Sequence, residues 1–264
     1  MQHMGSKLNL KTNEIHLWFA FPDEIRDPNL LSEYKKLLTP EEGKKQQRFY
    51  FEKHRHQYLV TRALVRTTLS RYTGIPVSDL RFDRNKYGRP ELVVVPKDFP
   101  IRFNLSHTDG LIACAVVLNQ DIGVDVEDMT RREISLETAD RFFSKTEVRD
   151  LHQVLESKKR DRFFEYWTLK ESYIKARGMG LSLPLEQFSF HLSENESLRI
   201  SFDPRLSDDP DRWRFWLLKP TGRHKAAVAI CGENRGAYEL TIRKAVPLSA
   251  AEDFPCAIVK HSDI

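Results

Sequence analysis

The chain has 264 residues, of which 40% are hydrophobic and 30% are charged, and its formal net charge is +4. This balance excludes a disordered chain, and the longest apolar stretch, Leu111–Leu118, is too short to cross a bilayer. The N-terminus has none of the features of a secretory signal, so we expect a cytoplasmic protein that does not contact membranes. The three cysteines are widely spaced, which favours buried free thiols over a disulfide framework or a metal site.

Two segments of the chain are rich in basic residues. The first holds Lys44, Lys45, Arg48, Lys53, Arg55, Arg62, Arg66 and Arg71, and the second holds Arg81, Arg84, Lys86 and Arg89. A solvated helix face is the simpler explanation of the first group, and composition alone favours it. An anion-binding surface is the alternative, because clustered cations raise the local concentration of polyanions. The candidate ligands are nucleic acid, an acidic protein and a phosphorylated small molecule.

The first half of the chain is predicted to form a strand, a long helix and several short strands. Alternating apolar residues predict a strand over Glu14–Phe21. Thr39–Glu42 has the composition of a capping box, and helical periodicity follows from about Lys44 to Tyr72. Gly74-Ile75-Pro76 then ends the helix. Short strands are expected at Leu80–Phe82, Glu91–Val95, Arg102–Leu105 and Leu111–Leu118.

The second half repeats this order of elements. Ile122–Val126 is predicted to be a strand, and Ser144–Glu147 is another capping box. Helical patterns continue to about Ala176 and stop at Gly178-Met179-Gly180. Strands are expected near Phe188–Leu192, Leu198–Phe202, Arg214–Leu218 and Lys225–Cys231.

We therefore predict an α+β fold made of a pseudo-twofold pair of similar α+β halves. Each half is a long helix packed on an antiparallel sheet, and a groove lies between the halves. The N-terminal half covers residues 14–120 and the C-terminal half covers 121–245. Residues 1–13 and 246–264 are predicted tails, and Met1–Ser6 resemble a remnant of expression or a ragged start.

Asp125 and Glu127, in the run Gly123-Val124-Asp125-Val126-Glu127, are the first candidate for a functional site. Residues two apart in a strand project from the same face, so both carboxylates lie together while Val124 and Val126 point into a core. Neighbouring carboxylate oxygens suit Mg²⁺, which usually keeps water and substrate phosphates in its other positions. A solvent-facing acidic strand edge is the alternative, and this segment alone does not decide between the two.

The second candidate is Glu171 with Lys175, in the run Trp167-Thr168-Leu169-Lys170-Glu171-Ser172-Tyr173-Ile174-Lys175-Ala176. The two residues are one helical turn apart and share a face. An ordinary surface salt bridge is the simpler explanation of the pair taken alone. The apolar residues around it indicate a helix that is at least partly buried.

The third candidate is the polar end of an apolar strand, Phe103-Asn104-Leu105-Ser106-His107-Thr108-Asp109-Gly110. Adjacent residues of an extended segment point in opposite directions, which argues against a direct relay between Ser106 and His107. A turn that donates the Ser106 hydroxyl and a His107 N–H to a phosphate is the more reasonable functional interpretation. A purely structural turn remains the alternative.

These segments together resemble the 4′-phosphopantetheinyl transferases. Phe-Asn-Leu-Ser-His, Gly-Val-Asp-Val-Glu and Trp-Thr-Leu-Lys-Glu-Ser-Tyr-Ile-Lys-Ala occur in the order and rough spacing of that family. The chain is most similar to the surfactin-type (Sfp-type) branch, in which one polypeptide holds two similar halves. Arg141–Glu147 and Gly178–Leu185 also resemble that branch, and the likeness runs from about Ile15 to Cys231.

The resemblance implies an enzyme that transfers the phosphopantetheine arm of coenzyme A to a serine of a carrier protein, releasing adenosine 3′,5′-bisphosphate. It implies that Asp125, Glu127 and Glu171 hold Mg²⁺ with the coenzyme A pyrophosphate. Glu171 is the candidate to help deprotonate the acceptor serine, directly or through water. Lys175 and His107 are expected at the pyrophosphate, where Lys175 would stabilise the departing bisphosphate.

The resemblance also accounts for part of the basic clustering. Ser106 is expected against the coenzyme A phosphates, and Lys45 stands where the family usually has a cation for the 3′-phosphate. Arg84 and Arg89 flank the Tyr-Gly-Arg-Pro turn, which resembles the adenine-side Gly-Lys-Pro loop of the family. Arg89 replaces a lysine there, and the two side chains differ in contact geometry. Glu42 stands where some relatives have a further lysine, so one phosphate contact is either absent or supplied by another residue, for which Arg62 is a candidate.

The expected partners are acyl or peptidyl carrier proteins of fatty acid, polyketide or non-ribosomal peptide pathways. Such partners are acidic, so a basic surface would speed encounter, and Phe143–Met179 is the predicted contact region. The internal duplication implied by the resemblance makes a monomer the expectation. Two other hypotheses remain: a nucleic-acid or phospholigand binding module using Lys44–Arg71, and a Mg²⁺-dependent hydrolase of coenzyme A or nucleotides. We expect no nucleic-acid partner under the leading hypothesis.

Overall fold

The structure is a computed structural model that describes residues 7–94, 99–131, 136–193, 197–232 and 237–262. Met1–Ser6 and the predicted strand end at Val95 lie outside these residues. The chain forms two compact units. Unit 1 contains Met1–Arg84, Pro90–Asn119 and Tyr238–Pro255, whereas unit 2 contains Asn85–Arg89, Gln120–Ala237 and Cys256–Ile264. Both units are discontinuous in sequence, unlike the predicted halves 14–120 and 121–245.

Unit 1 is built on a five-stranded sheet with the strand order β12-β11-β1-β5-β4. Its strands are β1 (Glu14–Ala20), β4 (Ile101–Thr108), β5 (Leu111–Leu118), β11 (Glu239–Val246) and β12 (Ala250–Asp253). Neighbouring strands are antiparallel except for β1 and β11, which run parallel from Glu14↔Glu239 to Phe19↔Lys244. A separate hairpin joins β2 (Phe82–Arg84) to β3 (Pro90–Leu92).

The helices of unit 1 are α1 (Pro28–Lys36), α2 (Pro40–Arg48) and α3 (Glu52–Thr73), preceded by the 3₁₀ turn Pro22–Glu24. The predicted capping box is confirmed, because Thr39 and Glu42 exchange both hydrogen bonds. The prediction of one helix over Lys44–Tyr72 is wrong, since Phe49 has an extended backbone. The Arg55 guanidinium donates to the carbonyls of Phe49 (2.9 Å) and Tyr50 (3.2 Å), which stabilises this break.

Unit 2 is built on a four-stranded sheet with the strand order β13-β9-β10-β6, in which every pair is antiparallel. Its strands are β6 (Asp121–Asp128), β9 (Trp213–Lys219), β10 (His224–Cys231) and β13 (Ala257–His261). The hairpin of β7 (Phe188–Leu192) and β8 (Leu198–Phe202) forms a second, two-stranded sheet. The segment 246–264, predicted to be a tail, therefore supplies β12 to unit 1 and β13 to unit 2.

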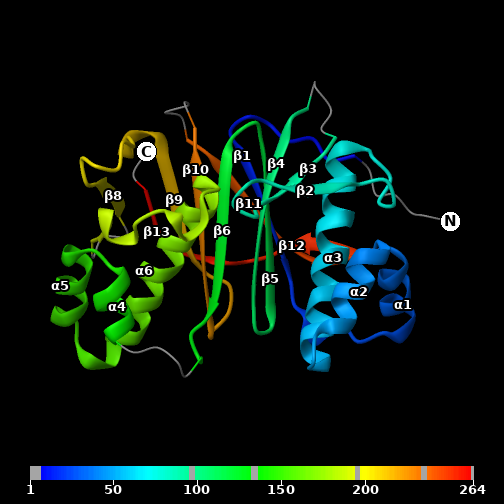
Figure 1. The fold of residues 1–264 in the computed structure, drawn as a ribbon, viewed down its shortest axis with the longest axis horizontal. Helices are drawn as coiled ribbons and strands as arrows, with labels where there is room; N and C mark the ends of the chain where they lie inside the picture. Colours follow the sequence, from blue (N-terminus) through cyan, green and yellow to red (C-terminus); the bar gives the residue numbers. More distant parts are fainter. Residues whose placement is uncertain (1–6, 95–98, 132–135, 194–196, 233–236, 263–264) are drawn as a thin grey trace. The chain divides into compact units, whose positions relative to one another are not determined.

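The helices of unit 2 are α4 (Leu136–Phe142), α5 (Lys145–Gln153) and α6 (Glu156–Arg177), with 3₁₀ turns at Gly180–Ser182, Leu185–Gln187 and Pro210–Arg212. Ser144 and Glu147 form the predicted capping box of α5. The 22-residue α6 packs on β6 and β10 (Figure 1). Gly178 ends it in the left-handed conformation with φ of 63°. The glycine supplies this conformation without steric cost.

The predicted α+β class is confirmed, because each unit combines one 22-residue helix with a sheet. In unit 1, α3 packs on β1, β4 and β5. Each unit has its own hydrophobic core. Cys114, Cys231 and Cys256 are free thiols, and Cys114 is fully buried. Of the helices in the described part of the chain, none combines the length and apolar character needed to cross a membrane.

Candidate active site

Strand β6 presents Asp125 and Glu127 on the face that α6 covers. Both carboxylates share this face with Gly123, whereas the buried Val124 and Val126 alternate with them on the other face. Asp125 is only 3% exposed, so its carboxylate is removed from bulk water. The pair is therefore not a solvent-facing strand edge.

Gly123 allows α6 to lie directly on the backbone of β6. A Cβ atom at this position would come within 3.0 Å of two backbone atoms of α6, Ser172 O and Ala176 N. Only glycine leaves room for this approach. Because the helix comes so close, the side chains of Glu171 and Lys175, on the same turns of α6, meet the carboxylates of β6.

Side chains of α6 contact both carboxylates of β6. The Lys175 Nζ atom lies 2.6 Å from Asp125 Oδ1. The Trp167 indole N–H donates to Glu127 Oε1 at 3.1 Å, and Arg131 Nη1 lies 3.3 Å from Glu127 Oε2. The result is a cluster within unit 2 that combines three carboxylates with a lysine.

The carboxylates of this cluster destabilise one another's charged forms. Burial, and next the charge of Asp125, raise the pKa of Glu127 to about 7. The same two causes raise the pKa of Glu171 to about 6, and Lys175 acts in the opposite direction. Like charges gathered in a partly dehydrated place favour protonation or the binding of a cation. Lys175 and Arg131 therefore do not fully offset the charge of the three carboxylates, and the cluster favours an added proton or cation.

The donor set of the cluster fits a hard divalent cation. Asp125, Glu127 and Glu171 offer only oxygen atoms, the ligands that Mg²⁺ prefers. As the side chains lie, however, the described residues include no group of three or more His, Cys, Asp or Glu residues placed to hold a metal ion. The ammonium group of Lys175 already stands at Asp125 Oδ1. Binding a metal with all three carboxylates thus requires these side chains to move, and Lys175 with them.

Ser106 and His107 lie on β4 of unit 1, opposite Ala113 and Ile112 of β5. Ser106 is buried at 7% exposure and His107 is exposed, as expected for neighbours on opposite faces of a strand. This geometry agrees with the argument against a direct Ser106–His107 relay. Their predicted contact with phosphates stays a prediction.

The remaining residues predicted to bind coenzyme A also have defined places. Lys45 is exposed on α2, with its Nζ atom 5.6 Å from the centre of the Tyr58 ring. Arg84 is exposed at the end of β2. Arg89 belongs to unit 2, and its Nη1 donates to Ala176 O at 3.0 Å. The predicted substitute, Arg62, is already paired with Glu42, so it does not stand ready for a phosphate.

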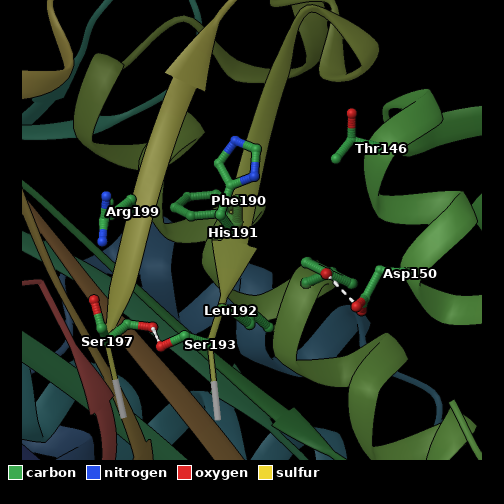
Figure 2. Close-up of a pocket in the computed structure, with 9 residues that line it drawn as sticks. Thr146, Asp150, Phe190, His191, Leu192, Ser193, Ser197 and Arg199 are labelled. Carbon is green, nitrogen blue, oxygen red and sulfur yellow. Dashed lines mark hydrogen bonds between the residues drawn. The ribbon is translucent and has the colours of Figure 1, made fainter. Parts of the chain in front are cut away.

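A cavity of about 460 Å³ lies elsewhere in unit 2, between α5 and the β7–β8 hairpin. Figure 2 shows Thr146 and Asp150 of α5 on one side and Phe190, His191 and Arg199 of the hairpin on the other. Asp150 accepts a hydrogen bond from the Tyr166 hydroxyl at 2.7 Å. None of the predicted site residues lines this cavity, so it is separate from the carboxylate cluster.

Gly123, Trp167 and Arg131 were not predicted as site residues, although they shape the cluster. Gly123 and Trp167 stand inside the motifs that were singled out, and each has a signal in the sequence. A glycine within a strand often marks a close backbone approach, and Trp167 lies one helical turn before Glu171. Arg131 has no such signal, because its contact depends on the turn that follows β6.

Comparisons with known proteins show to which family the chain belongs. Two family models match the chain: the 4′-phosphopantetheinyl transferase superfamily over residues 121–231, and the N-terminal region of 4′-phosphopantetheinyl transferases over residues 28–119. The 4′-phosphopantetheinyl transferase Sfp of Bacillus subtilis is 39% identical over 63% of this chain and 72% of its own length. The transferase HetI of a Nostoc species is 32% identical over 85% of this chain and 91% of its own length.

Among solved structures, the holo-[acyl-carrier-protein] synthase of Helicobacter pylori in complex with coenzyme A matches 42% of this chain and 99% of its own. Its TM-score is 0.34 and its sequence identity is 17%. The sequence relatives cover most of both chains at more than 30% identity, and both family models describe 4′-phosphopantetheinyl transferases. The chain belongs to the 4′-phosphopantetheinyl transferase superfamily and is a transferase of this kind.

Proposed function

We propose that the protein transfers the 4′-phosphopantetheine arm of coenzyme A to a serine of an apo acyl or peptidyl carrier protein and releases adenosine 3′,5′-bisphosphate. The observation that carries this proposal is the cluster of Asp125, Glu127, Glu171 and Lys175 where α6 crosses β6. In a member of this family, a cluster with surplus negative charge is suited to a pyrophosphate brought in with a divalent cation.

Mg²⁺ is the cation that the donor set fits, with Asp125, Glu127 and Glu171 as its proposed ligands. Bound there, it would neutralise charge on the pyrophosphate and orient the phosphorus under attack. Lys175 would move from Asp125 to the pyrophosphate, where its ammonium group stabilises the charge of the leaving bisphosphate. The lysine therefore holds Asp125 until the substrate arrives.

The reaction itself is a displacement at phosphorus. The serine oxygen of the carrier forms a bond to the phosphorus next to the pantetheine arm, and the P–O bond of the pyrophosphate bridge breaks. The electron pair leaves with adenosine 3′,5′-bisphosphate, and the serine proton passes to a base. Glu171 is the proposed base, directly or through water.

We assign the rest of coenzyme A to unit 1 and the β2–β3 turn on the basis of the family resemblance. Ser106 and His107 are proposed at the phosphates, Lys45 at the 3′-phosphate and Arg84 on the adenine side. Each is a polar or cationic residue suited to an anion. The region Phe143–Met179 is proposed to contact the carrier protein, and the protein is proposed to act as a monomer.

The test is incubation with coenzyme A, Mg²⁺ and an apo carrier protein, followed by intact mass measurement of the carrier. We expect the phosphopantetheine mass on the wild-type carrier and none on a carrier whose acceptor serine is replaced by alanine. Asp125→Asn and Glu171→Gln should each reduce the rate by at least about a hundredfold. Glu33→Gln is the control, because Glu33 is an exposed residue of α1, outside the proposed metal, coenzyme A and carrier contacts.

Two outcomes would replace the proposal. Release of adenosine 3′,5′-bisphosphate without any carrier protein would favour the hydrolase hypothesis. Binding of nucleic acid that weakens with salt and survives Asp125→Asn, together with no modification of any carrier, would favour the binding module.

A further inference from the structure

The turn Asn85–Arg89 belongs to unit 2 although the strands β2 and β3 that it connects belong to unit 1. Asn85 organises this turn, because its Oδ1 accepts from the backbone N–H groups of Tyr87 (2.9 Å) and Arg89 (3.0 Å). Gly88, with φ of 89°, donates its N–H to Asn85 O. Hydrogen bonds to Asn85, the first residue of the turn, therefore stabilise its conformation.

This turn supplies hydrogen-bond donors to the C-terminal end of α6. The Asn85 side-chain amide donates to Gly178 O, and Arg89 Nη1 donates to Ala176 O, both at 3.0 Å. The last carbonyls of a helix have no partners within the helix, and a cation near them is favourable. Two residues distant in sequence thus satisfy carbonyls at the end of α6.

The Arg89 guanidinium also packs directly against Gly178. A Cβ atom at Gly178 would lie 2.9 Å from Arg89 Cζ, so a larger residue here would push the Arg89 guanidinium aside, and the φ of 63° also favours glycine. The Arg89 side chain is only 15% exposed, and it also lies 3.7 Å from Asp121 at the start of β6. Most of its surface faces protein.

The same turn of α6 carries part of the proposed active site. Ala176, whose carbonyl Arg89 holds, follows Lys175 directly, and its backbone N–H lies over Gly123 of β6. The end of α6 is therefore fixed by β6 beneath it and by the Asn85–Arg89 turn beyond it. Any shift of this end moves Lys175 and then Glu171 relative to Asp125.

We propose that the Asn85–Arg89 turn is a helix cap that keeps Lys175 and Glu171 in register with Asp125, and that Arg89 is a positioning residue and not a ligand of coenzyme A. The catalytic part of this proposal rests on the proposed function. It also explains why arginine suits this place, since one planar guanidinium can donate to Ala176 O while its face packs on Gly178.

The first experiment measures capping without reference to activity. Gly178→Ala is compared with Gly74→Ala, because Gly74 ends α3 in the same left-handed conformation with open space at its Cβ position. Each change should lower the melting temperature by a few degrees through backbone strain, about 2–4 °C for Gly74→Ala. Gly178→Ala should lower it further, because the new methyl group displaces Arg89 from Ala176 O.

The double variant Gly178→Ala/Arg89→Ala separates the two contributions. If Arg89 caps α6, removing it from the Gly178→Ala protein should lower the melting temperature little more, although Arg89→Ala alone lowers it clearly. Additive losses would overturn the proposal. This comparison needs no substrate, so it remains decisive even if the proposed reaction fails.

The second experiment compares Arg89→Ala with Arg84→Ala in coenzyme A binding and turnover. We expect Arg89→Ala to reduce kcat about tenfold or more, with the Kd for coenzyme A within twofold of the wild type and a lower melting temperature. Arg84→Ala should raise that Kd and leave the melting temperature unchanged, because Arg84 is exposed. An Arg89→Ala protein with a tenfold weaker Kd and unchanged kcat and melting temperature would identify Arg89 as a ligand contact and overturn the proposal.

Discussion

Replacing Gly123 with alanine tests whether the close packing of α6 on β6 sets the geometry of the proposed site. The new Cβ atom would come within 3.0 Å of Ser172 O and Ala176 N. Both are backbone atoms, so no side-chain rotation relieves the contact. Strand β6 is paired along its length with β10, where Gly123 faces Ala229. The helix must therefore move, and it must move by more than about 1 Å to restore normal contact.

The size of the effect follows from that displacement. Overpacking of this kind typically costs about 1–3 kcal/mol of folding free energy. A misplacement of roughly 1 Å at a catalytic centre costs about a hundredfold in rate. We therefore expect Gly123→Ala to remain folded at room temperature, to melt several degrees lower, and to modify carrier protein about a hundredfold more slowly at saturating coenzyme A.

The assay is the rate of carrier modification by intact mass, measured together with the melting temperature. Gly222→Ala is the control, because Gly222 lies in unit 2 with open space at its Cβ position. A Gly123→Ala protein with a rate within threefold of the wild type and an unchanged melting temperature would refute the reasoning. It would mean that α6 can move without disturbing Glu171 and Lys175.

Two further predictions concern charge in unit 2. Lys170 and Glu147 form a fully buried ion pair at 2.8 Å. Lys170→Met should therefore lower the free energy of unfolding, measured by chemical denaturation, by about 3–5 kcal/mol, and adding Glu147→Gln should restore part of that loss. Equal stability of Lys170→Met and the wild type would contradict this prediction. The folded-state pKa values of Glu127 and Glu171 are about 7 and about 6, above the ordinary value of 4.5. In the metal-free folded protein these two carboxyl groups therefore bind more protons than they do in the unfolded chain. The contribution of the two groups to the free energy of unfolding falls as pH rises from about 4.5 to 7. His16, with its pKa lowered to about 4 by burial, acts in the opposite direction, so the measurement is the melting temperature from pH 5 to 8 of the wild type relative to Glu127→Gln, and a relative rise with pH would contradict the assignment. Mn²⁺ should bind more tightly as pH rises through this range, because metal binding competes with protons.

The sequence predicted the locally determined elements of the fold well. Both capping boxes formed, and Gly74 and Gly178 end the two long helices, because each of these signals depends on a few neighbouring residues. The break between α2 and α3 was missed. The Arg55 guanidinium stabilises this break by donating to carbonyls of the preceding loop. Such a contact cannot be predicted from helical periodicity.

The strands β11, β12 and β13 were missed for a different reason. Their residues lie C-terminal to the last motif, and the local sequence of a strand does not determine which sheet it will join. Glu14 pairs with Glu239, at the other end of the chain, and that choice is made by tertiary packing. The prediction therefore divided these strands by position in the sequence alone, between the C-terminal half (121–245) and the C-terminal tail (246–264).

The candidate site was predictable where the period of a regular element decides the geometry. Asp125 and Glu127 share a face because β6 is a strand, and Glu171 and Lys175 share a face because α6 is a helix. The contact of Lys175 with Asp125 and the place of Arg89 at the end of α6 were not predictable. Both depend on how closely the helix approaches the strand.

The C-terminal strands β11, β12 and β13 complete the sheets of both units, and this has a consequence for folding during biosynthesis. Strand β1 leaves the ribosome early, yet its parallel partner β11 follows only after nearly all of unit 2 has been made. The sheet of unit 2 is likewise incomplete until β13 has been synthesised and pairs with the edge of β9. Neither unit can complete its sheet until β11, β12 and β13 have been synthesised, so the units should not fold one after the other during synthesis. A nascent chain stopped before Glu239 would expose the unpaired edge of β1, which invites association with other chains.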